Sequence, residues 1–193
     1  MNKFYIGNKD DLRVLIVNTA RKKNISEAVI EKDYWVTFIL DYLFNENKWK
    51  EYFTFKGGTS LSKCFGLIER FSEDIDLILD WRVLGYEEKE PWIERSNTKQ
   101  DKFNKEVNEK TEEFLRDEFL EILEEDLNDF DFEFSIDTID PQTILCKYPK
   151  IFEPNYLTQN IRLEIGSLAA WTPAIEVEIL PIIGEALSLI HIS

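Results

Sequence analysis

A glycine pair and a pair of aspartates constrain this chain more than any other feature of its sequence. The aromatic segment Tyr52 to Lys56 runs into Gly57-Gly58, which predicts a short buried strand that stops at a tight turn. Thr59 or Ser60 can then cap a short helix, and Asp74 to Leu79 predicts a second, largely apolar strand. The two motifs therefore predict a strand, a turn, a short helix and a return strand.

Hydrophobic periodicity supplies the other elements. One helix is expected through Leu12 to Ala20, and a second, capped by Ser26, continues to about Phe44. An apolar stripe from Gln100 to Asn128 predicts the longest helix, whereas Asp80 to Thr98 has little periodicity and predicts a surface excursion beside the site. Alternation predicts further strands at Phe132–Ile139, Thr143–Tyr148, Ile161–Ile165 and Ile175–Ile179. The expected class is α+β, with a mixed sheet flanked by helices.

The length of 193 residues fits one domain. Apolar residues make up 44% of the chain, which is enough to build a core. We expect residues 1–50 to form N-terminal helices that pack on a core of residues 51–186, with a helical insertion at about 98–128. Residues 187–193 resemble read-through from a sequencing adapter, and we expect them to be a non-native or truncated tail.

Charge and cysteine content exclude several classes of protein. The net charge of −15 argues against a protein that covers duplex DNA with its general surface, because that surface repels phosphate. Two local basic groups are either a nucleic-acid path or ordinary solvated side chains: Lys147, Lys150 and Arg162, and Lys99, Lys102 and Lys105. Cys64 and Cys146 lie far apart with no histidine near either, which disfavours a disulfide framework or a zinc site.

The sequence also lacks signals for membrane insertion or export. No apolar run approaches the roughly 20 residues that span a bilayer. The segment Met1 to Asp10 lacks the basic and then apolar layout of a signal peptide. We therefore expect a cytoplasmic protein with no membrane partner.

Asp74 and Asp76 form the first candidate for chemistry. Alternate residues of a strand point to the same side with Cα atoms about 7 Å apart, so the two carboxylates share one face. Magnesium prefers one or two carboxylates together with the phosphates of the substrate. In an acidic protein such a pair is also compatible with a solvated strand face, but its apolar strand and the preceding glycine turn favour a metal site.

The Gly57-Gly58 turn is the matching candidate for phosphate binding. Glycine lets the backbone approach an anion closely, and the helix that follows directs unpaired N–H groups toward it. The turn lacks the GxxxxGK[ST] pattern of a Walker loop and the GxGxxG pattern of a dinucleotide site. A purely structural tight turn is the alternative.

Two-metal phosphoryl transfer usually uses a third carboxylate. Glu164 alternates with Leu163 and Ile165 in a predicted strand, so its carboxylate lies on the polar face, with the side chain of Arg162 as a neighbour. Glu176 or Glu178 could take the same role, and a surface glutamate on an edge strand is the remaining alternative.

The motif residues resemble the AbiEii/AbiGii toxin family of nucleotidyltransferases. The resemblance is carried by Lys56 to Lys63 and by Leu67 to Leu77. It extends to Glu31 to Thr37 and, more loosely, to Arg162 to Gly166. In all it covers most of the chain.

The resemblance implies a polymerase beta-like nucleotidyltransferase core that uses Mg²⁺, or Mn²⁺, and a nucleoside triphosphate. It further implies a toxin of a type IV toxin–antitoxin or phage-abortive system, with RNA or tRNA as the acceptor and a cognate antitoxin as a partner. The implied catalytic and metal-binding residues are Asp74, Asp76 and Glu164. The implied nucleotide-binding residues are Lys56, Gly57, Gly58, Thr59, Ser60 and Lys63.

Several alternatives remain open on the sequence alone. Lys56, Lys63 and Arg70 either neutralise phosphate or form structural ion pairs. The acceptor could be a small molecule instead of RNA. An inactive truncated domain that binds a nucleotide or a partner is the third possibility.

Overall fold

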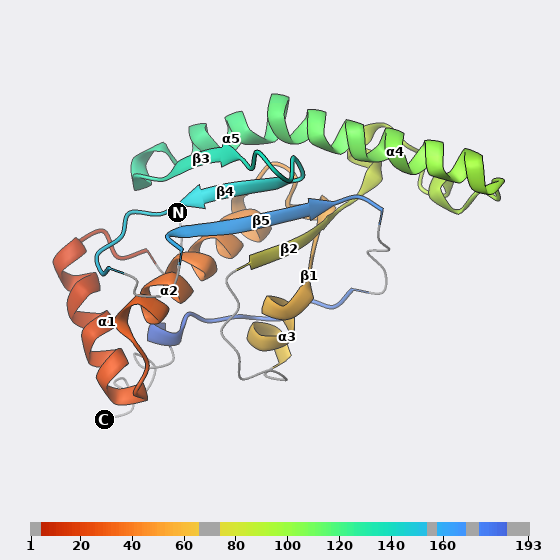
Figure 1. The fold of residues 1–193 in the computed structure, drawn as a ribbon. Coiled ribbons are helices and arrows are strands. Elements are labelled where there is room, and N and C mark those ends of the chain that lie inside the picture. The colour runs from red at the N-terminus through yellow and green to blue at the C-terminus, as the bar shows by residue number, and fades with distance from the viewer. Residues whose placement is uncertain (1–4, 66–73, 154–157, 169–173, 185–193) are drawn as a thin grey trace.

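A mixed sheet forms the centre of the molecule (Figure 1). The computed structural model describes residues 5–65, 74–153, 158–168 and 174–184. The strand order is β1-β2-β5-β4-β3, with β2 and β5 parallel and the other neighbours antiparallel. The strands are β1 Phe53–Lys56, β2 Asp74–Leu79, β3 Glu133–Ile136, β4 Thr143–Lys147 and β5 Asn160–Gly166. The predicted α+β class with a mixed sheet is confirmed.

Capping residues mark some boundaries of the α-helices. They are α1 Lys9–Lys23, α2 Glu27–Asp41, α3 Gly57–Phe65, α4 Asn97–Phe114 and α5 Leu120–Asp126. Asn24 ends α1 in the left-handed conformation, and the Ser26 hydroxyl accepts from the Val29 N–H at the start of α2, as predicted. π-helical segments at Tyr42–Glu46 and Leu115–Phe119 extend α2 and join α4 to α5.

The two faces of the sheet differ in chemistry. On one face, Ile75, Leu77 and Leu163 are fully buried in a core that also contains side chains of α2 and α5. Because side chains alternate across a strand, Asp74, Asp76, Arg162 and Glu164 point to the other face. Helices α2 and α5 therefore cover the apolar face, and the predicted site lies on the polar one.

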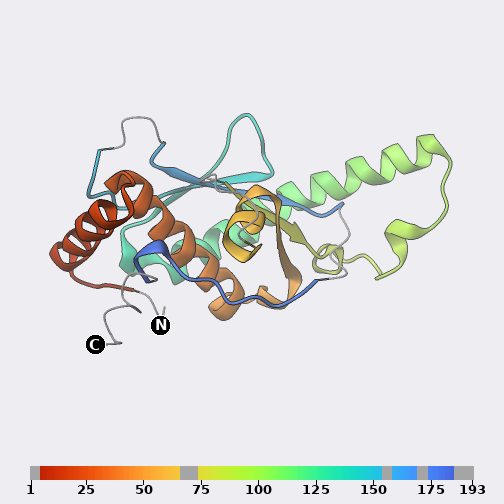
Figure 2. The same cartoon turned by 90° about the horizontal axis from the view of Figure 1, so that it is seen from below.

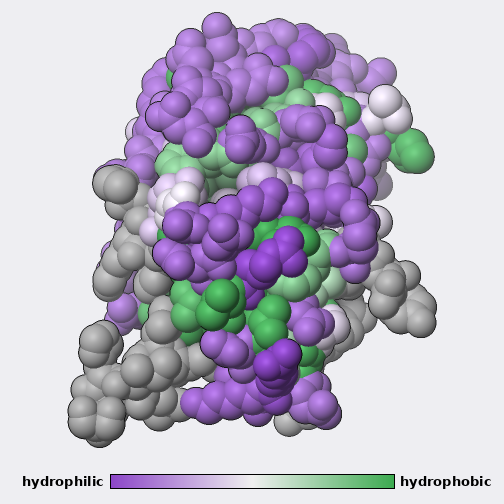
Figure 3. All heavy atoms as spheres, turned by 90° about the vertical axis from the view of Figure 1, so that its left-hand side faces the viewer, coloured by the Kyte–Doolittle hydropathy of each residue, from purple (hydrophilic) through white to green (hydrophobic). Residues whose placement is uncertain are grey.

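Helix α1 covers the outer side of α2. Its Leu12, Ile16 and Ala20 are buried, whereas its charged residues face outward. Figure 3 views this end of the molecule and shows a mainly hydrophilic surface with a limited apolar area. Val14, which is 57% exposed, is the large apolar side chain that α1 leaves in solvent.

Helix α2 is buried on all sides from Ile30 to Leu40, including the charged residues Glu31, Lys32 and Asp33. The Glu31 carboxylate accepts from the N–H groups of Ile151 (2.5 Å) and Phe152 (3.0 Å). Burial raises the pKa of Glu31, although these two donors oppose the shift. The Lys32 ammonium donates to the carbonyl and the hydroxyl of Thr158 at 3.0 and 3.4 Å. These bonds tie α2 to the connection that leads from β4 to β5.

Asp33 ties the same helix to two further segments. Its Oδ1 accepts from the Lys63 Nζ in α3 at 2.5 Å, and its Oδ2 accepts from the Ile182 N–H at 2.7 Å. The Lys63 ammonium also donates to the Thr37 hydroxyl at 2.9 Å. Asp33 therefore fixes α3, which follows the glycine turn, against α2.

The segment between β2 and α4 is more ordered than the sequence suggests. It contains the 3₁₀ turns Trp81–Leu84 and Glu90–Trp92. Trp81 and Tyr86 are buried and pack with Phe103 and Val107 of α4 in a second small core. Figure 2 shows α4 projecting from the sheet with this segment beside it. The segment is exposed over much of its length, as expected of a surface excursion, but its aromatic side chains pack it against α4 through contacts that periodicity does not reveal.

The predicted strand at Ile175–Ile179 is wrong. Residues 174–181 form no helix or strand, and Ile175 is 70% exposed. Alternation of apolar and acidic residues is present, but a strand forms only where its backbone pairs with a neighbour, and no described ladder includes this segment. The tail at 187–193 and the basic residue Arg70 lie outside the described residues.

Candidate active site

Two neighbouring parallel strands bring the predicted carboxylates together. In the register of β2 and β5, Asp74 is opposite Arg162 and Asp76 is opposite Glu164. All four side chains therefore lie on the same polar face of the sheet. The Asp74 and Glu164 side chains are 44% and 40% exposed, so a ligand can reach them from solvent.

Gly57 packs directly against Asp76. Its φ of +76° is a conformation that side chains disfavour, and a Cβ added there would lie 1.8 Å from Asp76 Oδ2. Burial is the main reason that the pKa of Asp76 is raised; the charges of Glu164 and Asp74 add to the shift, while Lys56 opposes it. The glycine turn and the carboxylate group therefore form one continuous site.

The start of α3 corrects the predicted helix cap. The helix begins at Gly57, so Thr59 and Ser60 lie within its first turn and do not cap it. The buried Thr59 hydroxyl donates to the Asp74 carbonyl, and the Ser60 hydroxyl donates to the Gly57 carbonyl at 2.9 Å. These side chains brace the turn against β2, so the backbone N–H groups of the first turn are the donors that remain for the predicted phosphate site.

The two lysines predicted to bind nucleotide lie in different environments. Lys56 is exposed and opposite Asp76 in the β1–β2 register, beside the carboxylates. Lys63 is instead held in the ion pair with Asp33, where the two side chains are only 9% and 5% exposed. The geometry therefore supports Lys56 as a phosphate neighbour and supports the structural alternative for Lys63.

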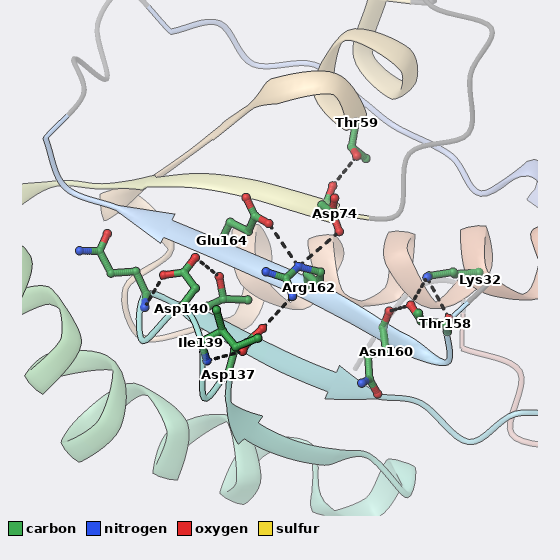
Figure 4. Close-up of polar contacts among 12 residues, drawn as sticks. Lys32, Thr59, Asp74, Asp137, Ile139, Asp140, Thr158, Asn160, Arg162 and Glu164 are labelled. Atoms are coloured by element: carbon green, nitrogen blue, oxygen red, sulfur yellow. Dashed lines mark hydrogen bonds and ion pairs between the residues drawn. The ribbon is translucent and has the colours of Figure 1, made fainter. Parts of the chain in front are cut away.

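Arg162 joins the carboxylates into a network (Figure 4). Its Nη1 donates to Asp137 Oδ2 at 2.7 Å, and its Nε lies 3.3 Å from Glu164 Oε1 and 3.9 Å from Asp74 Oδ1. The Ile139 N–H donates to the Asp137 carboxylate and is the main reason that the pKa of Asp137 is lowered, with Arg162 next. One guanidinium thus contacts carboxylates from three separate segments.

The donor set suits a hard divalent cation. Asp74, Asp76 and Glu164 offer carboxylate oxygens on one face, and the charge of Glu164 already disfavours ionisation of Asp76. Within the described ranges, no three acidic, histidine or cysteine side chains are already gathered at metal-binding distances. The guanidinium of Arg162 instead bridges Asp74 and Glu164 (Figure 4).

The alternative third carboxylates are placed less well. Glu176 and Glu178 are exposed on the segment that does not join the sheet. Glu164 is opposite Asp76 on the adjacent strand. The geometry therefore favours Glu164 over both, although its role as a ligand remains a prediction.

Sequence reasoning missed Asp137. The predicted strand included this residue, whereas β3 ends at Ile136 and Asp137 begins the turn to β4. The stretch Asp137 to Pro141 contains two aspartates and a proline, which was the available turn signal. Its contact with Arg162 depends on tertiary structure and has no local signature.

A separate hollow lies at the other end of the β1–β2 pair. It is lined by Trp49, Tyr52, Arg82 and Val83. Phe53 pairs with Leu79 at that end, whereas Lys56 pairs with Asp76 at the end that carries the carboxylates. The hollow is therefore not part of the candidate site.

The mixed sheet, with paired aspartates beside a glycine turn, is consistent with a nucleotidyltransferase-like domain. The family model described as nucleotidyl transferase AbiEii toxin, type IV toxin–antitoxin system, matches residues 39–192, and the chain belongs to this family. It is a nucleotidyltransferase toxin, and the family implies a cognate antitoxin and a nucleotide substrate. The resemblance seen in the sequence is confirmed.

No curated protein and no solved structure gives a significant match to the chain. A search of the described helices for a membrane span finds none with the length and apolar character to cross a bilayer. The family assignment therefore rests on the family model, and the residue roles rest on the geometry of the site.

Proposed function

We propose that this toxin transfers a nucleotide from a nucleoside triphosphate to a hydroxyl group of RNA, with tRNA as the preferred acceptor. Mg²⁺, or Mn²⁺ in its place, is the proposed cofactor. The observation that supports the proposal best is the register of β2 and β5, which sets Asp76 opposite Glu164 beside the glycine turn. An abortive response to phage infection is the proposed setting, and the cytoplasm, where RNA and triphosphates meet, is the proposed location.

The proposed cation would be held by Asp74, Asp76 and Glu164. When bound, it would neutralise charge on the phosphates and on the attacking oxygen. Backbone N–H groups after Gly57 bind the phosphates, and Lys56 adds a positive charge on the exposed side. These groups orient the α-phosphate toward the acceptor, so that positioning and electrostatics supply the catalysis.

In the proposed reaction, the acceptor oxygen bonds to the α-phosphorus while the bond to the β-phosphate oxygen breaks. Pyrophosphate leaves, and the proton of the acceptor hydroxyl passes to a carboxylate of the site and then to solvent. Burial, with the charges of Glu164 and Asp74, raises the pKa of Asp76, and a bound cation would favour its ionised form.

The experiment is transfer of label from α-phosphate-labelled triphosphates to total RNA and, separately, to a pool of small metabolites. The variant Asp76→Asn is expected to lose transfer by about 100-fold or more, the scale on which loss of one stabilising group acts. Asp117→Asn is the matched control, because it removes one charge from an exposed pair on the helical segment between α4 and α5, outside the candidate site.

The outcomes separate the candidate functions. Label on RNA that depends on Asp76 but not on Asp117 supports the proposal. Label on metabolites alone would replace RNA with a small-molecule acceptor. Triphosphate binding without transfer to any acceptor would contradict the proposed activity and indicate an inactive nucleotide-binding domain.

A further inference from the structure

Arg162 lies between the carboxylates that the proposed function assigns to a divalent cation. Its Nε approaches Glu164 at 3.3 Å and Asp74 at 3.9 Å (Figure 4). A guanidinium remains charged at any physiological pH. The resting site therefore already contains one positive charge placed between two of the predicted metal ligands.

The contacts of Arg162 are unequal. The bond from Nη1 to Asp137 is short, at 2.7 Å, and the Asp137 side chain is only 12% exposed. Asp137 is itself held by the Ile139 N–H at 2.8 Å. The contacts to Glu164 and Asp74 are longer and more exposed, so Asp137 is the firm anchor of the guanidinium.

A divalent cation and the Arg162 guanidinium would compete for the same oxygens. Both are attracted by Asp74 and Glu164, and they repel each other when both are close. The side chain of Arg162 is 35% exposed, so its outer atoms have room to move, and Asp137 lies on the side away from Asp74. A guanidinium that keeps its bond to Asp137 can release the other two carboxylates.

On the basis of the proposed function, we propose that Arg162 is an internal counter-ion of the metal site. It pairs with Asp74 and Glu164 when no divalent cation is bound and withdraws when one binds. Asp137 is a positioning residue that holds the guanidinium aside in the second state. This exchange determines the concentration of divalent cation at which the metal site becomes occupied.

The test measures binding of Mn²⁺ alone, without nucleotide, to the full chain. Arg162→Gln is expected to bind Mn²⁺ about fivefold or more tightly than the wild type, because no competing cation remains. Asp137→Asn is expected to bind several-fold more weakly, because the guanidinium then pairs with Asp74 and Glu164 more of the time. The double variant should match Arg162→Gln alone.

A matched control and a second readout accompany the titration. Arg116→Gln removes a guanidinium from an exposed pair with Asp117 and should leave Mn²⁺ affinity unchanged. Arg162→Gln should also lower the melting temperature without metal and increase the rise in melting temperature that Mn²⁺ produces. Neither readout requires catalytic turnover.

Opposite changes in Mn²⁺ affinity, tighter for Arg162→Gln and weaker for Asp137→Asn, would support the inference. Equal or weaker Mn²⁺ binding by Arg162→Gln, while the wild type still binds through Asp74 and Asp76, would overturn the inference and leave the proposed function intact. Tighter binding by Asp137→Asn would overturn the anchoring role. Absence of Mn²⁺ binding by the wild type and every variant would overturn the proposed metal site, and this inference with it.

Discussion

Two groups of charged side chains lie in this domain, and their surroundings differ sharply. On α2, Glu31, Lys32 and Asp33 are at most 4% exposed, and each has its own hydrogen-bond partners outside the helix. In the site, the side chains of Asp74, Glu164 and Arg162 are 35% to 44% exposed, and the two carboxylates share the Arg162 guanidinium as a partner. The buried charges hold segments in place because burial demands a dedicated partner. The half-exposed charges can exchange partners, which a binding site requires.

The largest effect is expected from Asp33→Ala in the buried group. The change leaves the Lys63 ammonium without its counter-ion and removes the acceptor of the Ile182 N–H. Loss of one partner of a buried pair costs about 3 to 5 kcal/mol, so the free energy of unfolding should fall by that amount. Urea unfolding measures it.

The control for this prediction replaces both partners with apolar residues of similar size. Asp33→Leu combined with Lys63→Met should be less destabilising than Asp33→Ala alone, since no unpaired charge remains. A fall of less than about 1 kcal/mol for Asp33→Ala would mean that the buried group behaves like an exposed pair, and the contrast between the two groups would fail.

An intermediate effect is expected from Gly57→Ala in the site. The added Cβ would lie 1.8 Å from Asp76 Oδ2, and the φ of +76° adds backbone strain. Together these should lower the free energy of unfolding by about 2 to 4 kcal/mol. Gly85→Ala is the matched control, because Gly85 has a φ of +84° but open space around it. It should cost only about 1 to 2 kcal/mol.

A double-mutant cycle separates the clash from the strain. Gly57→Ala should cost less in an Asp76→Gly background, where the colliding side chain is gone. Equal costs for Gly57→Ala and Gly85→Ala would show that Asp76 moves aside freely, and the close packing of turn and carboxylate would not constrain the site.

The smallest effect, and the only stabilising one, is expected from Asp76→Asn. The raised pKa of Asp76 reports burial and the neighbouring charges of Glu164 and Asp74, so the ionised form is disfavoured in the folded state. Without a divalent cation, the free energy of unfolding should rise by up to about 1 kcal/mol. Thermal or urea unfolding in a chelator measures the change.

The gain should shrink as sodium chloride is added, because salt screens the repulsion that the substitution removes. If Asp76→Asn instead lowered the free energy of unfolding, Asp76 would be a structural charge like Glu31, Lys32 and Asp33 of α2. The same variant serves the transfer experiment, so stability and activity are expected to change in opposite directions.

The elements that the sequence predicts well are those with local signals. The Ser26 cap, the apolar stripe of α4 and α5, and the aspartate strand β2 are each encoded by residues near one another. The segment Ile175 to Ile179 has the right alternation, but pairing is decided by distant strands. The correct patterns are therefore those in which a few neighbouring residues determine the conformation.

The site follows the same division. The Gly57 turn and the Asp74 to Asp76 pair could be identified from spacing alone, and Glu164 from its place in an alternating strand. The contacts of Lys63 with Asp33 and of Arg162 with Asp137 join residues that are far apart in the chain. No local pattern distinguishes such a partner from a solvated side chain, so the structure was needed to assign them.

The parallel pairing of β2 with β5 has a consequence for the cell that makes this toxin. Asp76 belongs to the first half of the chain and Glu164 to the last strand of the sheet. A growing chain on the ribosome cannot assemble the full carboxylate set until β5 has been synthesised and has left the exit tunnel. Under the proposed function, RNA beside the nascent chain therefore meets no complete site before β5 has paired with β2.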